Sequence, residues 1–237
     1  VQCKDQVIFA KDEVLKKDQS PYTVYTPYKN KWLQLYADQN STNYPIAQWD
    51  RFASIRQDFP TMSSLGFERS TIEVLPFDLA ELDDYDQTRD IPAINGTSKL
   101  GPHLRFGTVS IREVIEATGT NAVFLSELVW REFFMQILYH FPQVVSHNFK
   151  RKYDQINWRN DQEEFEKWKN GQTGYPMVDA GMRELNATGY MHNRVRMVAA
   201  GFLCKHLLID WQWGEAYFAS RLLDYDLSAN NGNWQWA

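Results

Sequence analysis

The 237-residue sequence contains only two cysteines, Cys3 and Cys204, and no apolar run long enough to cross a membrane. Two cysteines cannot build a disulfide framework, so the chain suits a reducing compartment. The sequence also shows no secretory signal peptide. We therefore expect a cytoplasmic protein that does not contact membranes.

The sequence also lacks the residue spacings of several common active sites. Its five histidines are scattered, and none has the spacing of a zinc site or of a Ser-His-Asp triad. Asp224 and Asp226 stand two apart, as in a calcium loop, but no EF-hand spacing follows them. We expect no metal site. The net charge of −5 argues against a protein that coats nucleic acid by bulk charge, although it permits a local basic groove.

Aromatic residues, in contrast, are abundant: they make up 15% of the chain and include nine tryptophans. With 43% hydrophobic residues, the chain can bury one sizeable core. Aromatic side chains in such numbers fill cores and line sites that bind flat rings. The sequence begins with Val1 rather than Met and stops after Trp236 and Ala237, from which we expect a fragment of a longer protein.

The first third of the chain has a mixed pattern. Residues 7–10 and 22–26 have the pattern of short strands, and a helix is expected to begin at Lys29. We interpret residues 1–36 as the last strands of a truncated α/β domain. Residues 37–80 mix Pro, Ser and Asp with short apolar pieces, which is typical of a linker.

Residues 81–237 show helical periodicity and almost no strand signals. The helical patterns cover residues 108–117, 121–141, 161–170, 177–187, 191–209 and 214–223. We therefore predict a mainly α protein, in which an all-helical domain over residues 81–237 follows the α/β remnant and the linker.

The stretch from Thr173 to Met197 concentrates chemically distinctive residues. Asn193 and Met197 are four residues apart and share one helix face, and Arg196 lies beside them. An amide, a guanidinium and a thioether in this arrangement could form the wall of a ligand site. The alternative is an ordinary helix start with solvated arginines, and composition alone favours that alternative.

Three further segments carry candidate binding residues. Residues 96–104 place hydroxyls, glycines and backbone N–H groups ahead of a helix, which suits a phosphate but equally an ordinary capping turn. Glu127 and Trp130 face one side of a helix, where they could bind a base-like ring or simply be a surface Glu beside a buried Trp. Asp224 and Asp226 could accept hydrogen bonds from a ring N–H and from an arginine.

The order and spacing of these segments are more specific than any one of them. The chain contains, in sequence, Tyr85, Arg89-Asp90, GTSKLGPHL, ELVWREF, TGYPMVDAGMREL, GYMHNRVRM and DYDLSANNGNWQW. This series closely resembles the flavin-binding catalytic domain of the DNA photolyase/cryptochrome family. Residues 1–36, with the passage SPYTVYTPYKNKW, resemble the end of that family's N-terminal α/β antenna domain. The resemblance implies an FAD folded into a U inside a helical bowl.

The resemblance also implies roles for individual residues. The positions around the FAD phosphates and ribityl chain are Tyr85, Thr97, Ser98, Lys99 and Leu100. The positions around the flavin ring are Asn193, Arg196, Asp224, Asp226 and Asn230. The positions for the damaged base and for DNA are Arg89, Glu127, Trp130, Arg131, Asn193, Arg194, Met197 and Trp236. The tryptophans expected to pass electrons to the flavin are Trp158, Trp211 and Trp234.

The implied activity is light-driven repair of DNA that contains pyrimidine dimers, by electron transfer from reduced FAD to a flipped-out dimer. A blue-light photoreceptor of cryptochrome type and a helical scaffold without a ligand are the alternatives. Asn193, Met197 and Asn230 favour a class I cyclobutane pyrimidine dimer photolyase. Tyr190 and Phe124 depart from the tryptophans that are common at these positions.

The resemblance leads to three further expectations. We expect a monomer, and we expect the antenna domain of the whole protein to hold a folate or a deazaflavin. The family continues past the last residues of this sequence with helices that close the bowl. We therefore expect the fragment to bind FAD poorly and to repair little, because the enclosure of the flavin would be incomplete.

Overall fold

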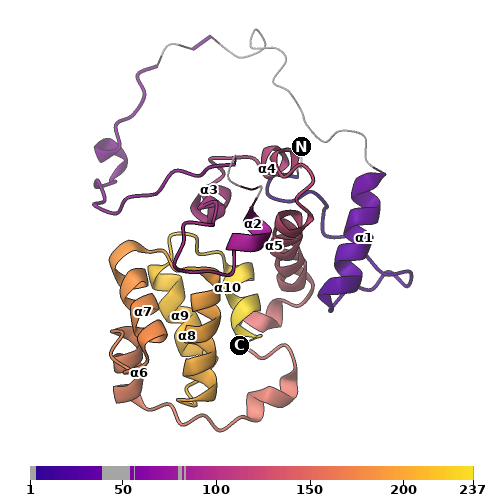
Figure 1. The fold of residues 1–237 in the computed structure, drawn as a ribbon. Coiled ribbons are helices and arrows are strands. Elements are labelled where there is room, and N and C mark those ends of the chain that lie inside the picture. The colour runs from indigo at the N-terminus through magenta and orange to yellow at the C-terminus, as the bar shows by residue number, and fades with distance from the viewer. Residues whose placement is uncertain (1–3, 39–53, 56, 80–81, 83, 237) are drawn as a thin grey trace.

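The computed structural model describes residues 4–38, 54–55, 57–79, 82 and 84–236, and over these residues the fold is helical without a named strand (Figure 1). None of the described helices is long and apolar enough to span a membrane. The α-helices are α1 (Tyr25–Ala37), α2 (Tyr85–Thr88), α3 (Leu100–Phe106), α4 (Ile111–Ala117), α5 (Ala122–His140), α6 (Gln162–Lys169), α7 (Pro176–Thr188), α8 (Asn193–Lys205), α9 (Trp211–Arg221) and α10 (Leu227–Trp234). The mainly α prediction is confirmed.

The two short strands expected near the N-terminus are absent. Residues 7–10 form no ladder, because the backbone N–H groups of Ile8 and Phe9 donate to the carboxylate of Glu132 on α5, at 2.7 and 3.2 Å. Helix α1 begins at Tyr25, inside the second expected strand. A short apolar run does not reveal whether its backbone donors meet another strand or a side chain, so the pattern was ambiguous.

One hydrophobic cluster joins the N-terminal segment to α5. Trp32 on α1 is only 1% exposed, and its indole N–H donates to Glu132 at 2.9 Å. Burial raises the pKa of Glu132, while three donors from the N-terminal segment and α1 act against that rise. A buried carboxylate with three donors fixes α1 and the preceding loop on the outer side of α5.

A second cluster lies among α6 to α10, which stand together in the lower part of the molecule (Figure 1). Met182 and Leu185, expected at helical spacing, are both almost fully buried in it. The indole of Trp168 is also fully buried and donates to the carbonyl of Ala199 at 3.0 Å. Helices α9 and α10 approach so closely that a Cβ on Gly214 would lie 2.1 Å from the ring of Trp234.

Helix α10 was not among the expected helices, because its sequence, LSANNGNW, has little apolar periodicity. Polar contacts hold it instead. Asp226 caps its N-terminus by accepting from the N–H of Ala229 at 3.0 Å. The buried amide of Asn231 donates to the carbonyl of Val144 at 3.0 Å. Interactions with distant residues therefore override weak helix propensity.

The segment of residues 57–79 runs outside the helices and contains one short 3-10 turn, Ser63–Leu65 (Figure 1). It returns to the helices near Leu75, whose N–H donates to the hydroxyl of Tyr190 at 3.0 Å. The carbonyl of Leu75 lies 2.9 Å from Nε2 of His103. The domain boundaries at residues 36 and 80 stay predictions.

Candidate functional site

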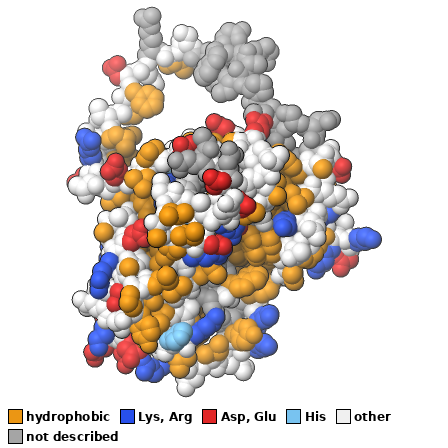
Figure 2. Space-filling view, viewed as in Figure 1, with side chains coloured by type: hydrophobic (Ala, Val, Ile, Leu, Met, Phe, Trp, Pro, Cys, Tyr) orange, Lys and Arg blue, Asp and Glu red, His pale blue; other side chains and the backbone are white. Residues whose placement is uncertain are grey.

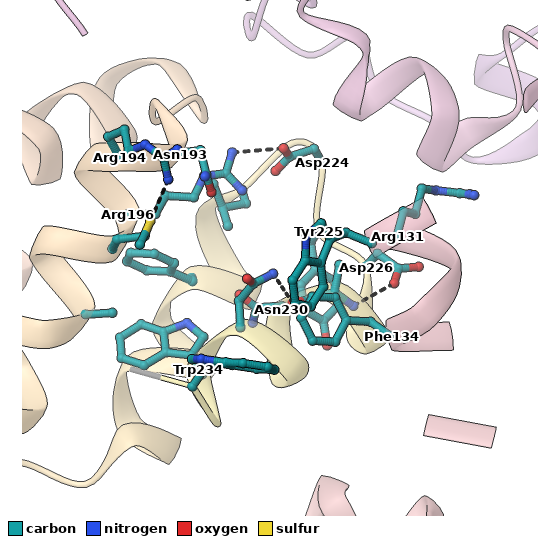
Figure 3. Close-up of a pocket in the computed structure, with 18 of the residues that line it drawn as sticks. Arg131, Phe134, Asn193, Arg194, Arg196, Asp224, Tyr225, Asp226, Asn230 and Trp234 are labelled. Atoms are coloured by element: carbon teal, nitrogen blue, oxygen red, sulfur yellow. Dashed lines mark hydrogen bonds and ion pairs between the residues drawn. The ribbon is translucent and has the colours of Figure 1, made fainter. Parts of the chain in front are cut away.

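A cavity of about 570 Å³ opens among α5, α8, α10 and the loop that leads into α10 (Figure 3). In the space-filling view a hollow opens among hydrophobic side chains, with lysine and arginine side chains beside it (Figure 2). The candidate residues that line the cavity are Arg89, Glu127, Trp130, Arg131, Asn193, Arg194, Arg196, Met197, Asp224, Asp226, Asn230, Trp234 and Trp236. Candidates from segments more than 100 residues apart are thus brought together. Tyr85, Thr97, Ser98, Lys99, Leu100, Trp158 and Trp211 do not line it.

Arg196 and Asp224 form a part-buried ion pair on one wall of the cavity, with Nη2 and Oδ2 2.8 Å apart (Figure 3). The Nε of Arg196 also donates to the carbonyl of Met191 at 2.9 Å, which fixes the guanidinium plane. The second carboxylate oxygen of Asp224 is buried and has no hydrogen-bond partner among the described residues. Because a buried acceptor without a partner is costly, this oxygen is suited to accept a hydrogen bond from a ligand.

The segment around Lys99 lies against this ion pair. Lys99 has a positive φ of 56° and occupies the position just before α3. A Cβ on Gly101 would lie 2.7 Å from both the Cβ and Oδ2 of Asp224, so only glycine allows α3 to approach the carboxylate this closely. The expected phosphate segment, residues 96–104, therefore begins a helix whose first turn contacts the cavity wall.

Gly101→Ala is expected to displace Asp224 and open its ion pair with Arg196, because the added methyl has no space. For the FAD that the resemblance implies, we predict about fivefold weaker binding, measured by quenching of flavin fluorescence. Glu113→Ala, on the exposed side of α4 and outside the cavity lining, is the control. Equal affinities of the two variants would contradict the role of this contact.

Asp226 and Asn230 complete this wall and are both held by protein contacts. Asp226 accepts hydrogen bonds from Ser228 and from the N–H of Ala229. The amide of Asn230 donates to Oε1 of Glu215 on α9 at 2.8 Å. Burial raises the pKa of Glu215, and the hydrogen bond from Asn230 opposes that rise. Sequence reasoning missed Glu215, because nothing in its local pattern links it to a residue 15 positions later.

Alternating charges connect the opposite rims of the cavity. Arg89 contacts Glu127 on α5 at 2.7 Å, and the adjacent Asp90 contacts Arg194 on α8 at 2.6 Å. Arg194 also lies 3.1 Å from the sulfur of Met197. Asp90 was quoted as part of a motif but not expected in the site. These two ion pairs hold Glu127 on α5 and Arg194 on α8 at fixed positions on either side of the opening.

Aromatic rings form the floor and one edge of the same opening. Trp130 meets Trp236 edge to face, with centroids 5.5 Å apart. Trp236 is 63% exposed, so its ring is free to cover a ligand. Phe134 and Phe218 also line the cavity and had not been expected there. The sequence had indicated only that they lie in the helical patterns of residues 121–141 and 214–223.

The three candidate tryptophans for electron transfer lie in one packed cluster. Trp211 and Trp234 are buried in the second hydrophobic cluster, and Trp158 packs against it. The indole of Trp211 donates to Oδ1 of Asn148 at 3.0 Å, and Trp234 lines the cavity. The cluster therefore reaches the cavity at Trp234. The electron-transfer role of these residues stays a prediction.

His192 occupies the N-cap position just before α8 and is a further residue whose role sequence reasoning did not identify. Its Nδ1 accepts the N–H of Arg194 at 3.1 Å, so the proton of the neutral ring is on Nε2. That Nε2 is buried and has no partner among the described residues. Burial, followed by the positive charges of Lys99 and Arg194, lowers the pKa of His192.

The lowered pKa of His192 predicts a pH dependence. As the pH falls, His192 takes up a proton near pH 6.5 in the unfolded state and only at a lower pH in the folded state. Protonation therefore favours the unfolded state. The free energy of unfolding that the neutral ring contributes above about pH 6.5 is lost as the pH falls through the pKa of the folded state. His192→Asn keeps a helix-capping acceptor but cannot titrate. Urea unfolding at a series of pH values should show a flatter profile for this variant. Parallel profiles would contradict the explanation.

Comparison with known proteins gives a consistent answer. Residues 124–237 match the model of the FAD binding domain of DNA photolyase. A deoxyribodipyrimidine photo-lyase from Vibrio cholerae is 39% identical over 257 residues, which cover 98% of this chain and 55% of the relative. The chain belongs to the DNA photolyase/cryptochrome family. The expected resemblance is thereby confirmed.

Two solved structures support the membership of this photolyase-family chain. A bacterial class III photolyase from Agrobacterium tumefaciens superposes with a TM-score of 0.82 and 34% identity, covering 98% of this chain and 54% of that one. An archaeal photolyase from Sulfolobus tokodaii, described as containing two FAD molecules, gives a TM-score of 0.64 and 51% identity over 67% of this chain and 37% of that one. The chain spans about half the length of the curated relatives it matches.

Proposed function

We propose that the protein repairs DNA in light, splitting cyclobutane pyrimidine dimers with FAD as the electron donor. One observation carries the proposal: the wall of Arg196, Asp224 and Asn230 and the rim of Glu127, Trp130 and Trp236 enclose a single cavity. A flavin and a damaged base could therefore meet in one site. The curated relatives of about 35–39% identity that support this proposal are named deoxyribodipyrimidine photo-lyases.

The residues present fit FAD. The unpartnered oxygen of Asp224 can accept from a ring N–H or a ribityl hydroxyl, and Arg196 holds that carboxylate in place. We propose that Asp226 and Asn230 line the flavin ring and that Thr97 to Leu100, with Tyr85, hold the phosphates and ribityl chain. Bound reduced FAD would supply the electron that splits the dimer.

The opposite rim suits a flipped base. A dimer has weakened pairing, so extruding it from the duplex costs less than extruding a normal base. We propose that Trp130 and Trp236 stack against it and that Glu127 accepts a hydrogen bond from the ring N–H between its carbonyl groups, with Asn193 and Met197 beside them. Arg89, Arg131 and Arg194 are proposed to contact DNA phosphates. An antenna folate or deazaflavin stays a prediction for the whole protein.

A light-dependent assay tests the proposal. The full-length protein is reconstituted with FAD, reduced, mixed with an oligonucleotide that carries one thymine dimer, and illuminated with blue light. We expect loss of the dimer in light and none in the dark, read by chromatography of the digested oligonucleotide. FAD binding with no splitting would instead favour the cryptochrome-type photoreceptor, and no FAD binding would favour the helical scaffold.

Trp211→Phe separates repair from photoreduction. If Trp211 relays electrons within the packed cluster, the variant should photoreduce oxidised FAD at least about fivefold more slowly, because phenylalanine is much harder to oxidise than tryptophan. Splitting by chemically reduced protein should stay unchanged. Transient absorption measures the first rate, and the dimer assay the second. Equal losses in both would contradict the assignment.

A further inference from the structure

Tyr25 stacks directly on Trp130, although the two residues come from different parts of the chain. Their ring centroids are 3.5 Å apart and their planes differ by 7°. The other ring neighbours of Trp130 among the described residues stand farther away, at 5.5–5.7 Å. Tyr25 therefore covers one face of an indole that lines the cavity.

Tyr25 is itself buried and held by its hydroxyl group. It is 8% exposed, and its hydroxyl lies 2.7 Å from both the carbonyl oxygen and the Oγ of Ser126. Burial raises the pKa of Tyr25 to about 12, so the hydroxyl keeps its proton and donates. The ring is thus tied to the turn of α5 that carries Glu127, the next residue after Ser126.

Helix α1 supplies a rigid support for this stack. Tyr25 is its first residue, and the next turns are fixed to α5 through Tyr28 against Phe133 at 5.2 Å and through Trp32 to Glu132. The indole of Trp130 therefore cannot turn about its side-chain bonds without breaking the stack. A flat group entering the cavity meets an indole whose plane is set in advance.

We propose that Tyr25 is a positioning residue for the damaged base, which fixes the ring plane of Trp130 in the orientation that stacks against a flipped pyrimidine dimer. The inference rests on the proposed function, because it names which residue shapes the dimer side of the cavity. Tyr25 does not line the cavity and acts through Trp130. Removing the ring should cost selectivity for the dimer while leaving the FAD side intact.

The stack can be observed without activity. Protein labelled with 5-fluorotryptophan gives one ¹⁹F signal per tryptophan, and Trp130→Phe identifies the signal of Trp130. Tyr25→Leu should shift and broaden that signal, because the ring current and the constraint are both lost, whereas Tyr25→Phe should leave it nearly unchanged. Tyr22→Leu is the matched control, since Tyr22 contacts Tyr28 rather than Trp130. An unchanged Trp130 signal in Tyr25→Leu would overturn the proposal.

Binding tests the positioning role. Preference for dimer-containing over undamaged oligonucleotide should fall about tenfold in Tyr25→Leu and stay near the wild-type value in Tyr25→Phe. In a Trp130→Leu background the further change Tyr25→Leu should have no added effect, because it acts through Trp130. Additive losses, or an unchanged preference in Tyr25→Leu, would contradict the role. A wild-type chain with no preference for dimers would instead contradict the proposed function.

Discussion

Arg196→Ala is expected to weaken FAD binding by about 2 kcal/mol, roughly thirtyfold in Kd. The variant leaves Asp224 without its only ion-pair partner among the described residues, and one oxygen of that carboxylate is already unpartnered and buried. Asp224 would then turn toward water, and the acceptor proposed for the flavin would be lost. Flavin fluorescence titration gives the change in Kd.

The control for Arg196→Ala is Arg221→Ala, which removes an exposed arginine at the end of α9, outside the cavity lining. Arg196→Lys adds a finer comparison, because a lysine keeps the charge but cannot hold both the carboxylate and the carbonyl of Met191 in one plane. Its affinity should lie between wild type and alanine. If Arg196→Ala binds FAD as tightly as wild type, the ion pair between Arg196 and Asp224 does not contribute to FAD binding.

Glu127→Ala is expected to reduce the preference for dimer-containing DNA about tenfold and to slow splitting in light. Glu127 contacts Arg89 and lines the cavity beside Trp130, so its loss removes the acceptor for the dimer and frees the arginine. FAD affinity should not change, since the residues proposed to hold the flavin ring lie on α8, on α10 and in the loop that leads into α10. Oligonucleotide titration and the light assay measure the two effects.

Two variants sharpen the test of Glu127. Glu127→Gln keeps a hydrogen-bonding group but breaks the ion pair, and Arg89→Ala breaks the same pair while keeping the carboxylate. If recognition depends on Glu127 itself, Arg89→Ala should keep dimer preference better than Glu127→Ala. Glu113→Ala on the exposed side of α4 serves as the control. If wild type and Glu127→Ala show the same preference for dimer-containing over undamaged oligonucleotide, the carboxylate does not recognise the dimer.

The sequence predicted those helices whose signals are local. A helix was expected over residues 121–141 and α5 spans Ala122–His140, because Asn121 caps it by accepting from the N–H of Phe124 and its apolar residues recur at helical spacing. Helix α10 has neither strong propensity nor periodicity and is held by contacts to residues far away in sequence. The expected strand at residues 7–10 failed for the same reason, since its partner is Glu132.

In the candidate site too, residues that belong to sequence motifs were predicted, whereas residues that act through contacts between helices were not. The family resemblance pointed to Arg196, Asp224 and Asn230, and the fold brings them to one cavity. It did not point to Glu215 or Tyr25, which contact site residues from other helices. Such supporting residues have no motif of their own, because their role depends on packing between elements rather than on neighbours along the chain.

A crystal structure of the full-length protein grown with FAD would test the central claim most directly, namely that one cavity holds the cofactor beside the place of the damaged base. We predict density for the flavin ring between Arg196, Asp224 and Asn230, with the ring edge facing Glu127 and Trp130 across the cavity. Flavin density elsewhere on the protein, with the cavity filled only by water, would contradict the account.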